Sequence, residues 1–308
     1  MSESRKALTK LGLPAADEPP EPSHKRFPDG GQYRIEIPST EGPASLRAVL
    51  EEGRNRAVPV HRVSQGSGIM LLSDGEIREM AALGDEAEVE VNLFIGPRAT
   101  FDIGAQAYSA AGKALGLSLR GSDQLVYALE DARRAVRLGI RSILVSDIGL
   151  LAIMGRLKRS GDLPGDLILK TSVMMAPANP SSARLLEDLG ATTVNVPSDL
   201  SLAQLAAIRK AIDAPIDLYV EAPDNIGGFV RHYEVPDFVR CGAPLYVKLG
   251  LRNAPDIYPS GTHIEPTAIR LSRERVRRAQ LVLERIAQYG QDLRMSPIGG
   301  RANARGEG

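Results

Sequence analysis

The sequence predicts a (β/α)8 barrel of the TIM type, and three observations lead to this fold class. Strand-like runs rich in Val, Ile and Leu alternate with helix-like stretches along the chain. The repeating units number eight and fill about 260 residues, which is the usual size of this barrel. A doubly wound sheet is the alternative, but no Gly-rich dinucleotide fingerprint follows the first strand.

Each expected unit pairs a short apolar run with an amphipathic stretch. The expected strands are 33–39, 58–65, 89–96, 142–147, 167–175, 192–198, 216–223 and 245–250. The expected helices are 43–57, 73–83, 122–139, 149–161, 181–190, 201–212, 233–242 and 272–290. Ser73, Ser122 and Ser272 are the expected capping residues of three of them, because serine accepts a hydrogen bond from the first turn.

Both ends of the chain differ in composition from the middle. Residues 1–31 are rich in proline and charge, and we expect a flexible, irregular arm there. Residues 291–308 are expected to form a flexible tail, which leaves 32–290 as the barrel and catalytic domain. The segment 98–121 is long for a loop in such a barrel, and we expect it to cover the mouth.

Composition excludes several classes of protein. Lys plus Arg and Asp plus Glu both number 38, and aromatics make up 4% without Trp, so a nucleic-acid partner is disfavoured. Cys241 is the single cysteine, which excludes an internal disulfide and an iron–sulfur cluster held by this chain alone. The N-terminus has no apolar signal region, and no run approaches the roughly 18 residues of a membrane span. We therefore expect a cytoplasmic protein without a membrane partner.

Alternation along the strands places many polar side chains inside the barrel. The purely apolar parity should meet the helices, so the other parity faces inward. Arg34, Glu90 and Asp217 come early in their strands, and we expect a structural ion network from them. A second set comes late, toward the face where barrel enzymes keep their sites; it consists of Glu36, Asn92, Ser146, Lys170, Asn195, Glu221 and Lys248. In the second strand, either Arg62 or His61 with Gln65 faces inward.

Two lysines and two carboxylates at one barrel mouth suggest chemistry. The alternative is a buried network in which Lys170 and Lys248 only neutralise Glu36 and Glu221. A lysine between apolar walls can lose its proton and act as a base or form an imine. Beside a carboxylate it stays charged and stabilises an oxyanion or holds a substrate carboxylate. The sequence leaves these alternatives open.

No cofactor is predicted, although a divalent metal is left open. His232, His263 and Asp224 follow the seventh and eighth strands and are the candidate ligands, but they lack an HExxH-type spacing. Cys241 ends a helix at the opposite face and is expected to be a packed thiol. The arginine-rich stretch 270–278 predicts either a solvated helix face or a subunit contact, so a homo-oligomer is compatible with the sequence.

Four phrases occur in order along the chain: "IEIPSTEGP", "HRVSQGSGIMLLSDGEI", "NLFIGPRATFDIG" and "YVKLGLRNAPDIYPSGTH". With them, roughly residues 32 to 290 resemble the peptidase U32-like proteins, particularly the short single-barrel members. The resemblance implies a (β/α)8-type barrel. Some members of the family are described as collagen- or peptide-degrading, and others hydroxylate RNA or quinone precursors and carry an iron–sulfur cluster. Better-known members have His-Gly and cysteines after a strand-end glutamate, where this chain reads Glu221-Ala-Pro-Asp-Asn-Ile-Gly-Gly, so a cluster-dependent hydroxylase is disfavoured.

The predicted function is that of a hydrolase acting on a small polar, carboxylate- or amide-bearing molecule or a peptide. Glu36 or Glu221 is the expected general acid/base, and Lys170 and Lys248 stabilise anionic charge or react as amines. The expected substrate-binding residues are Arg62, Gln65, Asn92, Arg98, Ser146 and Asn195. The alternatives are a lysine-dependent lyase or aldolase, and a non-catalytic accessory subunit of an RNA- or cofactor-modifying complex.

Overall fold

The computed structural model describes residues 2–17, 20–95 and 118–299, and within them eight parallel strands form a nearly closed barrel. The strands are β1 (Tyr33–Pro38), β2 (Arg62–Ser64), β3 (Glu90–Phe94), β4 (Ser142–Val145), β5 (Ile168–Thr171), β6 (Val194–Asn195), β7 (Ile216–Glu221) and β8 (Leu245–Leu249). Their order is β5-β4-β3-β2-β1-β8-β7-β6. An isolated parallel bridge between Lys170 and Thr193 joins β5 to the segment before β6. The predicted (β/α)8 barrel is confirmed.

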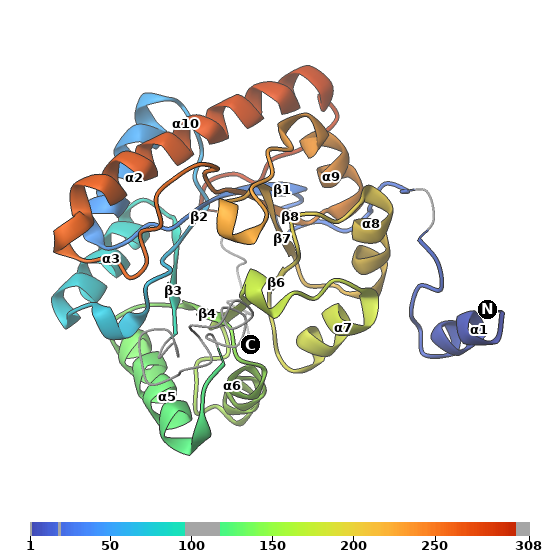
Figure 1. The fold of residues 1–308 in the computed structure, drawn as a ribbon, viewed down its shortest axis with the longest axis horizontal. Coiled ribbons are helices and arrows are strands. Elements are labelled where there is room, and N and C mark those ends of the chain that lie inside the picture. The colour runs from blue at the N-terminus through green and yellow to red at the C-terminus, as the bar shows by residue number, and fades with distance from the viewer. Residues whose placement is uncertain (1, 18–19, 96–117, 300–308) are drawn as a thin grey trace.

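The helices other than α1 surround the strands, whereas α1 lies outside that ring, as Figure 1 shows. They are α1 (Ser2–Lys10), α2 (Pro43–Asn55), α3 (Asp74–Glu86), α5 (Gly121–Arg137), α6 (Ile148–Ser160), α7 (Pro180–Asp188), α8 (Leu202–Ala211), α9 (Val235–Gly242) and α10 (Glu265–Tyr289). Short 3-10 helices lie in the loops: η1 (Ile69–Leu71), η3 (Val173–Met175), η4 (Asp224–Ile226), η5 (His232–Glu234) and η6 (Thr262–Ile264). The helix α1 falls in a segment for which the sequence predicted an irregular arm.

The main core lies between the strands and the helices. Ile35, Ile37, Val247 and Leu249 are fully buried there, as the apolar parity predicted. The other parity carries the charged side chains of the barrel interior, so the strands separate an apolar outer layer from a polar centre.

Capping was predicted well at one helix and wrongly at two. Ser73 caps α3 and forms a capping box with Glu76. Ser122 lies inside α5, one residue after its start. Ser272 is buried inside α10, which begins earlier, at Glu265. Proline suits the first turn of a helix because its missing N–H has no partner there, and Pro266 occupies that turn of α10.

Parts of the arm and the tail pack against the N-terminal end of the barrel. The Ser23 N–H donates to the Arg240 carbonyl at 2.6 Å, and the Phe27 side chain is buried. Met295 pairs with Tyr33, and the Ser296 hydroxyl donates to Asp29 at 2.9 Å. These contacts hold both segments against this end of the barrel. The boundaries at 31 and 290 stay predictions, and residues 98–117 of the expected mouth cover lie outside the described residues.

Candidate active site

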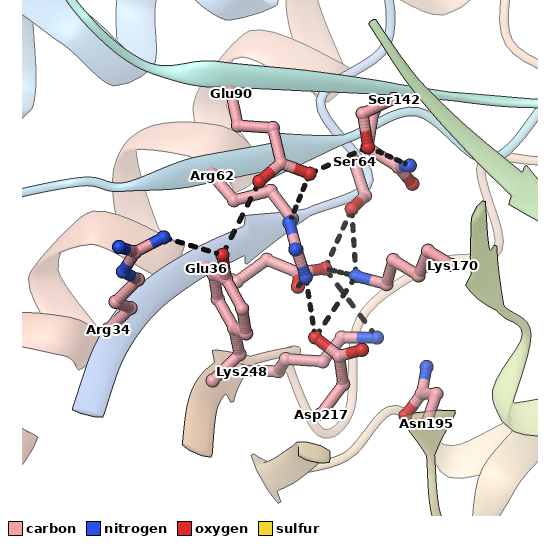
Figure 2. Close-up of polar contacts among 12 residues, drawn as sticks. Arg34, Glu36, Arg62, Ser64, Glu90, Ser142, Lys170, Asn195, Asp217 and Lys248 are labelled. Carbon is pink, nitrogen blue, oxygen red and sulfur yellow. Dashed lines mark hydrogen bonds and ion pairs between the residues drawn. The ribbon is translucent and has the colours of Figure 1, made fainter. Parts of the chain in front are cut away.

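A cluster of charged side chains fills the middle of the barrel (Figure 2). Its members come from six strands, and strand stagger brings different positions to one level. Glu36 is the fourth residue of β1, whereas Asp217 is the second of β7 and Arg62 the first of β2. Lys170 and Lys248 complete this level from β5 and β8, and Glu90 lies beside Arg62.

Glu36 is the centre of the cluster. Its Oε1 accepts a hydrogen bond from the Ser64 hydroxyl at 2.7 Å and contacts Lys170 Nζ directly. Lys248 Nζ lies 3.6 Å from the same oxygen, and Arg62 Nη1 lies 3.3 Å from Oε2. Glu36 therefore meets three cations inside a fully buried site.

Asp217 belongs to the same cluster. The sequence placed it in a separate network with Arg34 and Glu90, and that prediction is wrong. Asp217 Oδ1 lies 2.7 Å from Arg62 Nη1 and 3.7 Å from Lys170 Nζ. The reason is the stagger of β7, which raises its second residue to the level of Glu36.

The charges of the cluster balance. Arg62 Nε also lies 2.7 Å from Glu90 Oε1, so Glu36, Asp217 and Glu90 face three cations. The Arg62 guanidinium stacks on the Tyr246 ring, 3.5 Å from the ring centroid to the guanidinium carbon. Isolated buried charges are costly, and mutual pairing reduces that cost.

The pKa values within the cluster shift in different directions. Burial favours the protonated form of Glu36, but the charges of Lys170, Lys248 and Arg62 outweigh it and hold the pKa of Glu36 well below its usual range. Burial raises the pKa of Asp217, and the charge of Glu36 adds to the rise. Burial lowers the pKa of Lys170 to about 8 despite the carboxylates beside it. Glu36 is thus held ionised, which makes it a poor general acid.

Lys248 contacts two further residues of the barrel interior, Tyr219 and Asn195. Its ammonium group lies 4.0 Å from the centroid of the Tyr219 ring. In the amide orientation that satisfies its neighbours, Asn195 accepts from Lys248 Nζ at 2.8 Å and donates to the Asp217 carbonyl at 3.1 Å. The structure therefore brings together Glu36, Arg62, Lys170, Asn195 and Lys248 of the residues expected from the sequence.

Glu221 has a different set of partners. The register of β7 against β8 shifts between Tyr219 and Glu221, so the strand is irregular where alternation predicted another inward residue. Glu221 Oε2 lies 3.0 Å from His232 Nε2, and Oε1 accepts from the Arg252 N–H at 3.2 Å. Glu221 is buried, whereas the His232 side chain is 11% exposed. The result is a carboxylate–imidazole pair at the carboxyl end of β7.

The other expected substrate-binding residues have different surroundings. Gln65 and Asn92 form hydrogen bonds with neighbouring segments, Ser146 is half-buried, and Arg98 lies outside the described part. The Gln65 side chain accepts from the Gly68 N–H in the β2–α3 connection and from the Phe94 N–H at the end of β3. Asn92, in its satisfied orientation, accepts from the Ser142 hydroxyl at 2.7 Å and so ties β3 to β4. Ser146 is half-buried after β4, and Arg98 lies outside the described residues.

The three candidate metal ligands do not converge. His232 pairs with Glu221, Asp224 Oδ1 lies 3.5 Å from Arg252 Nε, and His263 is exposed on η6. Within residues 2–17, 20–95 and 118–299, no three His, Cys, Asp or Glu side chains are grouped in a way that could hold a metal ion. The expectation of no cofactor stays a prediction.

Sequence reasoning missed Arg275 and Arg278, which it assigned to a solvated face or a subunit contact. Arg275 is 95% buried, and its Nη1 donates to the Ser39 carbonyl at 3.4 Å. Arg278 Nε lies 3.8 Å from Glu221 Oε2. Helical periodicity could have separated this inner pair from Arg273 and Arg277, because positions three apart share a face.

These features define a class of protein, the (β/α)8 barrel with a charged interior and polar groups at the carboxyl ends of its strands. Residues 118–222 match the model of peptidase family U32. Over this part of the chain, the match confirms the resemblance to the peptidase U32-like proteins that was found in the sequence.

Several solved structures are similar in fold. The U32 peptidase Mk0906 is 17% identical with a TM-score of 0.41, over 65% of this chain and 73% of that chain. A putative copper homeostasis protein, CutC from Streptococcus agalactiae, is 15% identical with a TM-score of 0.46, over 70% and 98%. A putative lyase/mutase from Burkholderia cenocepacia J2315 is 13% identical with a TM-score of 0.47, over 94% and 89%. No curated protein matches the sequence.

No helix in the described part of the chain is both long and apolar enough to cross a membrane. The cytoplasmic location, the homo-oligomer and the small-molecule or peptide partner stay predictions.

Proposed function

We propose that this U32-like barrel is an enzyme, a hydrolase for a small polar substrate that carries a carboxylate or an amide. The observation that supports the proposal is the Glu221–His232 pair, 3.0 Å apart, at the carboxyl end of the strand beside Lys248. A histidine oriented by a carboxylate is a common general base, and it can activate water for attack on a carbonyl.

In this proposal each polar or charged residue has a separate role in the reaction. His232 takes the proton of water, and Glu221 orients the imidazole. The carboxyl ends of the strands form the rim of the proposed site. On it, Lys248 of β8 and Asn195 of β6 hold the substrate carboxylate or the developing oxyanion. Glu36 and Lys170 do not touch substrate. They fix the position and charge of Lys248, since Glu36 Oε1 contacts the ammonium groups of both Lys170 and Lys248.

The second candidate is a lysine-dependent lyase. Its support is the pKa of Lys170, which burial lowers to about 8, so that a larger fraction of the amine is neutral. Against it, Lys170 is fully buried and in contact with Glu36.

One experiment separates the two candidates. Purified protein is incubated with a panel of dipeptides and amino-acid amides, and products are followed by mass spectrometry. A parallel arm adds borohydride with keto acids and aldehydes and measures intact mass. We expect hydrolysis of a panel member, its loss in Lys248→Met and its retention in the exposed control Lys210→Met. A trapped adduct that disappears in Lys170→Met or Lys248→Met, without hydrolysis, would replace the hydrolase by the lyase.

A further inference from the structure

A cavity of about 350 Å³ lies at the N-terminal end of the barrel, opposite the rim that carries Lys248 and Glu221. Glu90, Ser142 and Ile168 line it, and each is the first residue of its strand. Its volume falls within the range of small-molecule pockets. The cavity is therefore a separate space from the proposed catalytic rim.

Much of the wall is apolar. Phe27 of the packed arm, Val91, Ile140, Ile168 and Pro215 contribute hydrocarbon surface. Such surface favours an apolar ligand, because binding removes both surfaces from water. Phe27 and Pro28 come from the arm, so the pocket is complete only with this part of the arm in place.

Two buried polar atoms of the lining residues have no hydrogen-bond partner in the described part of the chain. They are Nη2 of Arg62, which is fully buried, and Oγ1 of Thr193, which is 96% buried. A buried donor without a partner is costly, and such groups usually bind water or a ligand. Both atoms carry a hydrogen to donate, and both belong to residues that line the cavity.

The balance of charges in the barrel cluster indicates that the ligand is uncharged. Arg62 already contacts Glu36, Asp217 and Glu90, and these three carboxylates balance Arg62, Lys170 and Lys248. An added anion would leave an uncompensated negative charge in a buried site. A neutral acceptor oxygen can use the free donors without disturbing this balance.

We propose that this cavity binds a small, uncharged, largely apolar molecule whose ketone, amide or alcohol oxygen accepts a hydrogen bond from Arg62 or Thr193. The site is independent of the proposed hydrolase chemistry, since none of the residues assigned to that chemistry lines it.

The test uses the full-length protein and acetophenone as the probe, with benzoate as a charged analogue of similar size. Binding is measured by titration calorimetry and by ligand-observed NMR. We expect saturable binding of acetophenone with a dissociation constant in the millimolar range and binding of benzoate at least about tenfold weaker.

Three variants locate the site. Ile168→Phe adds volume inside the cavity, and we expect it to abolish binding. Leu185→Phe makes a similar change on the exposed face of α7 and should leave binding unchanged. Thr193→Val keeps the shape but removes the hydroxyl, and we expect roughly threefold or greater weakening if that donor is used; unchanged binding in this variant assigns the oxygen to Arg62.

Thermal unfolding checks that each variant is folded. The proposal is overturned if the folded wild type shows no saturable binding of acetophenone, or if benzoate binds equally well. Equal affinity in wild type and folded Ile168→Phe would also overturn it. If Ile168→Phe does not fold, the amide chemical shifts of residues lining the cavity decide, because acetophenone must perturb them and not those of the opposite rim.

Discussion

Lys170 and Lys248 carry the same charge but have different surroundings. Lys170 is fully buried between Glu36, Ser64 and Asp217, and its side chain does not reach solvent. Lys248 has Asn195 and Tyr219 as neighbours, and its side chain is 3% exposed. At the scale of single residues, the proposed function therefore assigns the field of the site to Lys170 and the contact with a ligand to Lys248.

His61 provides a pH test at the same scale. Its Nδ1 accepts from the Ile35 N–H at 3.1 Å, and its Nε2 lies 2.9 Å from the Ser296 carbonyl oxygen, as expected for a neutral ring. Burial lowers the pKa of His61 from its usual 6.5 to about 4. Between pH 6.5 and about 4, His61 is therefore protonated in the unfolded chain but neutral in the folded chain. The stability of the protein is full above pH 6.5 and falls as pH drops toward 4.

We expect wild type to lose about 2–3 kcal/mol more than His61→Asn between pH 7 and about pH 4.5, in the free energy of unfolding by urea. Asparagine keeps an acceptor for Ile35 without titrating. The exposed His24→Asn should follow the wild-type pH dependence. Parallel curves for wild type and His61→Asn would show that the ring is not held neutral.

At the scale of elements, the ends of β7 and β8 determine the rim. The Gly250 N–H donates to the Glu221 carbonyl at 2.7 Å, which brings the two strand ends together beyond the register shift. A Cβ at Gly250 would lie 2.7 Å from both the Glu221 carbonyl oxygen and Pro223 Cδ. Glycine is required here by close approach of the backbone.

We expect Gly250→Ala to destabilise the protein by about 1–3 kcal/mol, because backbone must move to admit the methyl group. Gly165→Ala is the matched control, since a Cβ there meets no atom within 4 Å, and we expect a change within roughly 0.5 kcal/mol. Both are measured by urea unfolding. Equal stabilities for the two variants would mean that the strand ends are not tightly packed.

Sequence alternation predicted most of the inward residues, because period-2 patterning reports which face of a strand is apolar. Glu36, Lys170 and Lys248 were found in this way. It could not predict that Asp217 reaches their level, because strand stagger depends on closure of the whole barrel. It also could not predict the register shift before Glu221, which gives that carboxylate His232 as a partner instead of a lysine.

At the scale of the molecule, the charged cluster connects six of the eight strands. Glu36, Arg62, Glu90, Lys170, Asp217 and Lys248 belong to β1, β2, β3, β5, β7 and β8. The pairing of strands and the helical ring could be predicted from repeat and length. The contacts across the barrel centre could not, because they join residues far apart in sequence.

We expect Lys170→Met to cost about 3–5 kcal/mol in the free energy of unfolding, because it leaves Glu36 and Asp217 short of a cation. Lys210→Met, at an exposed position on α8, should cost less than about 1 kcal/mol. The double variant Glu36→Gln with Lys170→Met should cost clearly less than the sum of its single changes, since it removes both charges. Strict additivity would argue against a coupled cluster.

The most direct measurement of the proposed function is kcat/KM for His232→Gln, on the panel substrate that wild type hydrolyses best, beside His263→Gln as control. Glutamine can still bond to Glu221 but cannot act as a general base. We expect a loss of roughly 10²–10⁴-fold in His232→Gln and nearly wild-type activity in His263→Gln. Wild-type activity in folded His232→Gln would contradict the assignment of the Glu221–His232 pair as the catalytic base.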